Sequence, residues 1–154
     1  MFLYRLIRIF RKHNVHFAIV GGYAVALHGA VRGTLDVDVI LRLTKKNYRA
    51  AEIALREIGL MPRLPVEAGQ IFDYRKEYIR NKNLTAWSFW NPDNPAEIVD
   101  VIITQDLKKF KIKQVRSDNH IIPILGLGDL IRMKRKSGRP QDLEDAKALE
   151  ELKK

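Results

Sequence analysis

The sequence contains no cysteine, and this absence excludes disulfide bonds and cysteine-ligated zinc sites. Its four histidines are scattered, and none has the H-E-x-x-H spacing that is typical of zinc proteases. No apolar run is long enough to cross a bilayer. We therefore expect a protein of a reducing, cytoplasmic setting with no membrane partner.

The chain is rich instead in hydrophobic and basic residues. Its 154 residues are 46% hydrophobic, which is enough for a substantial core and predicts one domain over residues 1–154. The formal net charge is +10. Such an excess favours a polyanionic partner such as RNA, although a generally basic surface would give the same number.

A stretch from Val20 to Leu41 contains the most informative pattern. An apolar strand over 17–20 leads into Gly21 and Gly22, a short helix over 23–28 follows, and a second strand is expected over 36–41. Paired glycines at a helix start expose backbone N–H groups. Those groups and the helix dipole both favour a bound phosphate.

Two aspartates begin the second of these strands. In an extended chain Asp36 and Asp38 point to the same side, whereas Val37 and Val39 point to the other. Two carboxylates on one side of a buried strand repel each other unless a cation lies between them, and Mg²⁺ prefers such oxygen ligands. The alternative is a solvated pair at an exposed strand start.

A later apolar strand carries a third carboxylate. The run from Glu97 to Ile103 is apolar after Glu97 except for Asp100, and a carboxylate in such a run is rarely left without a partner. Either Asp100 faces the site of Asp36 and Asp38, or it lies at a strand edge and pairs with a lysine or arginine.

The C-terminal region predicts two helices that carry charged residues inward. Lys134 falls on the apolar stripe of a helix over 127–137, and Pro140 opens a last helix. Asp142 and Asp145 share one face of that last helix. An inward lysine needs an anion, which is either a ligand phosphate or one of these two aspartates.

At these residues the chain resembles a known family. Gly21-Gly22, followed by Arg32-Gly33-Thr34-Leu35-Asp36-Val37-Asp38, resembles the signature of the nucleotidyltransferase superfamily related to DNA polymerase beta. The R-x-T-x-D-x-D form is similar to the branch that contains AbiEii-type and MNT-type toxins of toxin–antitoxin systems. The K-x-x-x-x-R-P-x-D-x-x-D array that begins at Lys134 resembles the C-terminal motifs of the same branch. Gly22 departs from the family, because many members have serine there.

The resemblance implies an α+β fold, in which a small mixed β-sheet has helices packed on one side. It implies a nucleotidyltransferase that uses a nucleoside triphosphate, most simply ATP, and releases pyrophosphate. The three catalytic aspartates would hold two Mg²⁺ ions, with Mn²⁺ as an alternative, and the third would act as the base: Asp36, Asp38 and Asp100. The nucleotide would be bound by a second set of residues: Gly21, Gly22, Arg32, Thr34, Lys134, Asp142 and Asp145.

The acceptor is left open by the sequence. The toxin resemblance and the basic charge favour an RNA end or a protein hydroxyl, with an antitoxin as a further partner. Residues 71–83 mix aromatic and basic side chains, as surfaces that bind single-stranded nucleic acid do, but half-buried amphipathic segments have the same composition. Two alternatives remain, namely a non-catalytic module that binds RNA or a partner, and a small-molecule nucleotidyltransferase of the aminoglycoside type.

Overall fold

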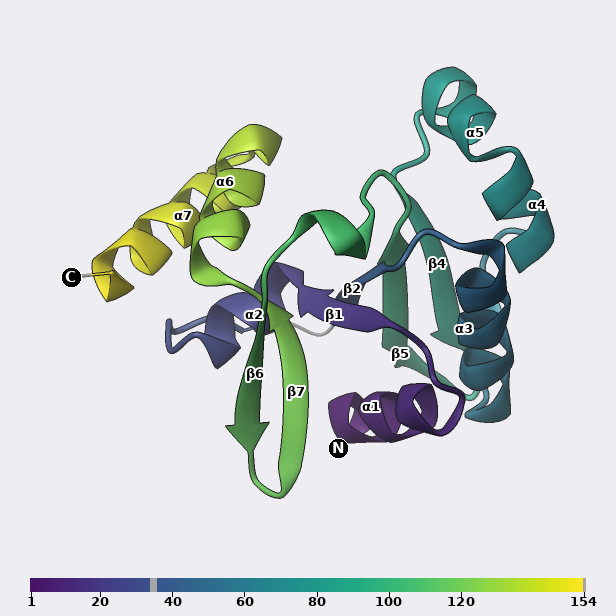
Figure 1. Ribbon diagram of the computed structural model, residues 1–154, viewed down its shortest axis with the longest axis horizontal. Helices are drawn as coiled ribbons and strands as arrows, with labels where there is room; N and C mark the ends of the chain where they lie inside the picture. Colours follow the sequence, from purple (N-terminus) through teal and green to yellow (C-terminus); the bar gives the residue numbers. More distant parts are fainter. Residues whose placement is uncertain (34–35, 154) are drawn as a thin grey trace.

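A mixed β-sheet forms the centre of the protein in a computed structural model that describes residues 1–33 and 36–153 (Figure 1). The described residues form seven strands in the order β3-β4-β5-β2-β1-β7-β6. These strands are β1 (Phe17–Val20), β2 (Val37–Leu41), β3 (Met61–Pro62), β4 (Ala86–Asn91), β5 (Asn94–Ile102), β6 (Ile112–Ser117) and β7 (His120–Leu125). The helices are α1 (Phe2–Lys12), α2 (Gly21–Leu27), α3 (Lys45–Glu57), α4 (Ala68–Asp73), α5 (Arg75–Lys82), α6 (Leu127–Ser137) and α7 (Pro140–Leu152), with a 3₁₀ turn at Leu107–Lys109.

The central strands combine both kinds of pairing. β2 lies between β1, to which it is antiparallel, and β5, to which it is parallel. β1 is buried along its whole length, as the uninterrupted apolar run predicts. Val37 and Val39 are fully buried on one face of β2, so the alternation seen in the sequence sets which face packs on the core.

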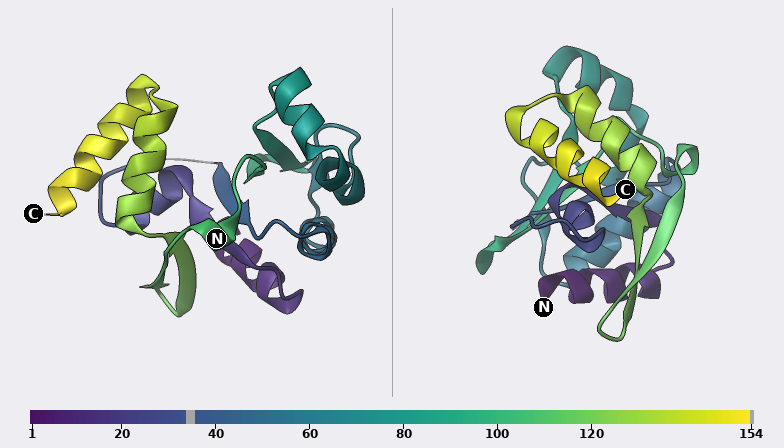
Figure 2. Two further views of the ribbon diagram at one scale, coloured as in Figure 1. Left: turned by 45° about the horizontal axis from the view of Figure 1, so that its top comes forward. Right: turned by 90° about the vertical axis from the view of Figure 1, so that its left-hand side faces the viewer.

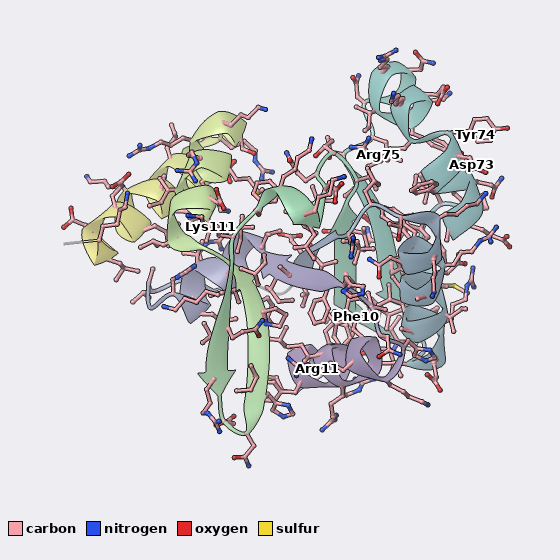
Figure 3. The ribbon with its side chains drawn as sticks, in the orientation of Figure 1. Phe10, Arg11, Asp73, Tyr74, Arg75 and Lys111 are labelled. Atoms are coloured by element: carbon pink, nitrogen blue, oxygen red, sulfur yellow. The ribbon has the colours of Figure 1, made fainter. Side chains whose placement is uncertain are left out.

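That packed face is covered by α1 and α3. Phe10 points from α1 toward the sheet (Figure 3) and meets Phe17 of β1 at a ring-centroid distance of 4.9 Å. α3 begins at the predicted cap, where the Thr44 side chain accepts a hydrogen bond from the Asn47 backbone N–H. Tyr48 of α3 stacks on Trp87 of β4. The predicted α+β fold, with helices packed against a mixed sheet, is confirmed.

Two further helical pairs stand on either side of the strands β2 and β5. α6 and α7 pack on each other at one end of the sheet, and α4 and α5 lie toward the other end (Figures 1 and 2). Gly138 ends α6 in the left-handed conformation, with φ of +70°, which lets α7 turn back along α6. This return brings the two predicted charged helices together.

The outer parts of the chain carry much of the positive charge. β6 is an edge strand and carries Lys113 and Arg116, and charged side chains of this kind are common on sheet edges. Residues 71–83 form the second half of α4 and all of α5, and α5 contains no buried residue, so nucleic-acid contact there stays a prediction. Within residues 1–33 and 36–153, no helix combines the length and the apolar character needed to cross a membrane.

Candidate active site

Two predicted aspartates lie side by side on adjacent parallel strands. Asp38 of β2 is in register with Asp100 of β5, and neither is on the face that Val37 and Val39 bury in the core. On its other side, Asp38 is paired with Val20 of β1, which immediately precedes the Gly21 turn. Parity and strand pairing therefore bring together carboxylates that are 62 positions apart in the numbering.

Asp36 lies in the same cleft as this pair. The cleft has a volume of about 680 Å³, and its lining includes Gly22, Arg32, Asp36, Asp38, Asp100, Lys134, Arg139 and Asp142. Most of the residues predicted from separate parts of the sequence thus share one cavity. Thr34, which was predicted to contact the nucleotide, lies outside the described residues.

The carboxylates perturb each other strongly. Burial raises the pKa of Asp38 to about 7, and the charges of Asp100 and Asp36 and a hydrogen bond with Asp100 add to the rise. Burial and the charge of Asp100 also raise the pKa of Asp36, while Arg63 opposes that rise. The ionised forms of Asp36 and Asp38 are therefore unfavourable in this cleft, and a bound cation would stabilise them.

Asp100 has a partner that sequence reasoning missed. The Ser88 hydroxyl donates a hydrogen bond of 2.5 Å to Oδ1 of Asp100, to which Ser88 is directly opposite on β4. This bond fixes one oxygen of the carboxylate. The alternative prediction was that Asp100 pairs with a lysine or arginine. Among the described residues, Asp100 forms no such ion pair and is instead bonded to Ser88.

The glycine turn packs directly on the aspartates. Gly21 has φ of +64°, a conformation that side chains rarely adopt. A Cβ atom placed there would lie 2.8 Å from the Asp38 carboxyl carbon, closer than such atoms approach each other. Gly22 is buried and lines the cleft. Glycine at position 21 is therefore required for both the turn and the close approach to Asp38.

Opposite the aspartates lies a network of ion pairs. Lys134 Nζ is 3.4 Å from Oδ1 of Asp142 and 3.0 Å from Oδ2 of Asp145. Arg32 pairs with Asp145 at 3.1 Å, and Arg139 pairs with Asp142 at 2.8 Å. Three cationic side chains face two carboxylates here, which leaves the network one positive charge in excess. The internal ion pair that was the alternative for Lys134 is present, and Lys134 also lines the cleft.

The two aspartates of this network differ in position. Asp142 lines the cleft, whereas Asp145 is buried behind it and is not among the lining residues. Burial works to raise the pKa of Asp142, but the hydrogen bond from Arg139 and the charge of Lys134 outweigh it, and the pKa is lowered. Asp145 holds Lys134 and Arg32 in place. Arg139 was missed as a cleft residue, although it stands in the motif that begins at Lys134.

The donor set suits a hard divalent cation in its chemistry. Carboxylate oxygens are the ligands that Mg²⁺ takes, and the raised pKa values of Asp36 and Asp38 show how unfavourable their charges are together. Within residues 1–33 and 36–153, no group of three or more His, Cys, Asp or Glu side chains is arranged to hold a metal ion. The three aspartates share the cleft in this conformation without forming a finished coordination shell.

Comparison with known proteins reveals similarity in fold only. No family model matches the chain, and no curated protein matches its sequence. A structure of the lincosamide antibiotic adenylyltransferase LnuA, bound to lincomycin, has a TM-score of 0.66 at 13% identity and covers 98% of this chain and 96% of its own. The antibiotic-resistance factor ANT(2'')-Ia has a TM-score of 0.63 at 9% identity, with coverage of 98% and 86%. A nucleotidyltransferase-like protein of Paracoccidioides brasiliensis has a TM-score of 0.56 at 14% identity, with coverage of 96% and 74%. The chain therefore has the fold of nucleotidyltransferases.

Proposed function

We propose that this protein is a metal-dependent nucleotidyltransferase that moves a nucleoside monophosphate from a nucleoside triphosphate, most simply ATP, to an acceptor hydroxyl. The observation that carries the proposal is the register of Asp38 with Asp100, beside Asp36 and next to the Gly21 turn. A non-catalytic domain has little reason to keep three carboxylates at this electrostatic cost. The nucleotidyltransferase fold of the chain supports the same reaction.

The residues of the cleft divide into two roles. Lys134 and Arg139, whose network has a positive charge in excess, would hold the β- and γ-phosphates, with the backbone at Gly22 close enough to approach them. Asp100, oriented by the bond from Ser88, would accept the proton of the attacking hydroxyl. Arg32, which also lines the cleft, would assist in holding the phosphates, and Asp145 would position both Lys134 and Arg32.

Asp36, Asp38 and Asp100 are the residues that would hold two Mg²⁺ ions, or Mn²⁺ in their place. When bound, such ions neutralise phosphate charge and brace the attacking and leaving oxygens of an in-line displacement. The aspartates themselves fix where the α-phosphorus lies. Because Gly21 packs against Asp38, the position of this carboxylate depends on the turn as well as on β2.

Two classes of acceptor are consistent with this chemistry. The likeness to AbiEii- and MNT-type toxins supports an RNA end or a protein hydroxyl, within a cytoplasmic toxin–antitoxin pair. The fold similarity to LnuA and to ANT(2'')-Ia supports a small molecule instead, because the first was solved with lincomycin and the second with adenylyl-2''-tobramycin. Asp36, Asp38 and Asp100 would perform the same chemistry in either case.

The test is transfer of label from α-labelled nucleoside triphosphates in MgCl₂ to RNA, protein and small-molecule fractions of a cell extract. We expect label in one fraction with wild type and a loss of about 100-fold or more with Asp36→Ala or Asp38→Asn, because these variants remove groups that act together. Glu97→Gln is a matched control, since Glu97 lies on the opposite face of β5 and pairs with Arg5. It should retain transfer.

Label in no fraction, with any nucleotide or divalent metal, would refute the proposal. RNA binding that persists in Asp36→Ala and Asp38→Asn and needs no Mg²⁺ would instead establish the non-catalytic binding module. Equal transfer by Asp38→Asn and wild type would also contradict the assigned roles, even if label is incorporated.

A further inference from the structure

A second cavity, which is mainly apolar, lies at the edge of β4. Its volume is about 220 Å³, and its apolar walls come from Leu64, Val66, Ile71, Leu84 and Trp87. The edge of β4 is open here because β3 ends at Pro62, whose partner is Phe89. The cavity is therefore formed where the sheet loses its outer strand, under the segment that joins β3 to α4.

Three residues connect this cavity to the cleft of the aspartates. Ala86 lines both cavities. Ser88 lines the apolar cavity, and its hydroxyl donates to Asp100. Arg63 lines the apolar cavity as well, and its charge acts on Asp36 across the boundary. The apolar cavity thus adjoins the candidate active site on the side of Asp100, and the two share Ala86.

The row of paired residues across the sheet indicates on which side each substrate binds. From one side to the other the row runs Ser88, Asp100, Asp38 and Val20, and Gly21 follows Val20. The glycine turn stands at the β1 end of this row, and the apolar cavity stands at the β4 end. In an in-line displacement the attacking and leaving oxygens lie on opposite sides of the α-phosphorus. If pyrophosphate leaves toward Gly22, the acceptor must enter from the side of Ser88.

We propose that the apolar cavity beside Ser88 is the acceptor subsite, and that the acceptor is a small molecule with an apolar group next to its nucleophilic hydroxyl. This inference rests on the proposed nucleotidyl transfer. The acceptor oxygen forms a bond to the α-phosphorus, the bond from that phosphorus to the pyrophosphate oxygen breaks, and the hydroxyl proton passes to Asp100. The products are the phosphodiester of the acceptor and pyrophosphate.

The walls favour a small molecule over RNA. Arg63 is the only cationic side chain among the lining residues that the structure describes, so the phosphates next to an RNA end would find little countercharge there. The apolar lining and the modest volume suit one hydrophobic group of a ligand. The wall is also held in place, because the Arg63 backbone N–H donates to Ser88 O at 2.9 Å and Trp87 Nε1 donates to Val66 O at 3.2 Å. A preformed subsite of this kind costs little ordering on binding.

The first test is binding of benzyl alcohol, with glycerol as a polar comparison, followed by amide and indole NMR shifts. We expect benzyl alcohol to shift the signals of Ala86, Ser88 and the Trp87 indole, and glycerol to leave them unchanged. Leu64→Glu should weaken the binding by about tenfold, because it places a charge in an apolar wall. Leu143→Glu is the matched control, since Leu64 and Leu143 are both 51% exposed and Leu143 lies on α7. Equal melting temperatures of the two variants would show that both fold.

The second test is transfer of label from α-labelled ATP to the small-molecule fraction of a cell extract. We expect Leu64→Glu to lower this transfer about tenfold while the binding of Mg²⁺ and ATP is unchanged, and Leu143→Glu to lower neither. The inference is overturned if benzyl alcohol does not shift the cavity signals, if both variants lose transfer equally, or if RNA or protein is labelled at an unchanged rate by Leu64→Glu. Failure of Mg²⁺ and ATP to bind at all would instead refute the proposed function.

Discussion

Replacing Gly21 with alanine would perturb the site through a single carbon atom. The added Cβ would overlap the carboxylate of Asp38, whose carboxyl carbon would be only 2.8 Å away. Gly138 provides a matched control, because its φ of +70° is close to the +64° of Gly21. A Cβ at Gly138 has its nearest neighbour at 3.7 Å, which is an ordinary contact. The two alanine variants therefore share backbone strain and differ in the overlap.

The expected magnitudes follow from this comparison. A left-handed alanine costs about 1–2 kcal/mol, and for a chain of this size each kcal/mol lowers the melting temperature by about 2–4 °C. Gly138→Ala should therefore melt about 2–8 °C below wild type, and Gly21→Ala should melt lower still, because the overlap adds about 1–3 kcal/mol. Gly21→Ala must also push the Asp38 carboxylate away by roughly an ångström, and a misplacement of that size costs up to about 100-fold in rate. Gly138→Ala should stay within about threefold of wild type in rate, because strain alone leaves the carboxylates in place.

The assay is the initial rate of pyrophosphate release from ATP in MgCl₂ with the labelled fraction as acceptor, paired with melting curves of the same samples. A loss in rate confined to Gly21→Ala, with both variants still folded at the assay temperature, is the predicted pattern. Equal rates for Gly21→Ala and Gly138→Ala would refute the idea that the turn sets the position of Asp38.

Three further variants test separate parts of the site. Ser88→Ala removes a bond to a charged group, which is worth about 1.5–3 kcal/mol; the rate should fall about 10- to 100-fold while the affinity for ATP, measured by calorimetry, stays the same. Lys134→Met leaves two buried aspartates with less countercharge, at a cost of up to about 3–5 kcal/mol, so its melting temperature should fall by up to about 20 °C. The melting temperature of Arg135→Met, at an exposed ion pair, should change little. The pKa of Asp38 is raised to about 7, so the folded protein holds a proton that the unfolded chain releases above the ordinary pKa of 3.8. Stability therefore falls as the pH rises between these two values. Asp38→Asn should therefore raise the melting temperature more at pH 8 than at pH 5, and MgCl₂ should stabilise only the wild type.

The sequence was sufficient to predict that Asp36, Asp38 and Asp100 come together, and their catalytic role stays a prediction. Asp36 and Asp38 alternate with valines that pack in the core, and Asp100 is the only acid in its apolar run. These signals are local, because strand parity follows from the backbone itself. The inward position of Lys134 follows in the same way from helical periodicity.

The partner of Asp100 could not be predicted, because it depends on a bulge. Asn91 pairs with Asn94, and extending that pairing along both strands would place Thr85 opposite Asp100. The register shifts between Trp90 and Asn91, and Ser88 takes the position instead. A shift of this kind arises from how the turn residues close the hairpin and leaves no periodic signal in the sequence.

The basic side of the cleft shows the same limit. Arg139 precedes Pro140 and reads as a loop residue, yet the return of α7 along α6 places it in the cleft with Asp142. Arg63 lies in a segment rich in proline, whose sequence is typical of a loop. Its position beside the apolar cavity depends on the hydrogen bond from its backbone N–H to Ser88 O. Both positions are set by the packing of distant elements, which local patterns do not contain.

We propose that Asp36, Asp38 and Asp100 hold divalent cations at the point of nucleotidyl transfer. The most direct measurement is anomalous scattering from crystals grown with Mn²⁺ and an ATP analogue that has a methylene group between its α- and β-phosphates. We expect two manganese peaks within coordination distance of these carboxylates, with the phosphates toward Lys134. A nucleotide bound without metal at these aspartates, or manganese bound only elsewhere, would contradict it.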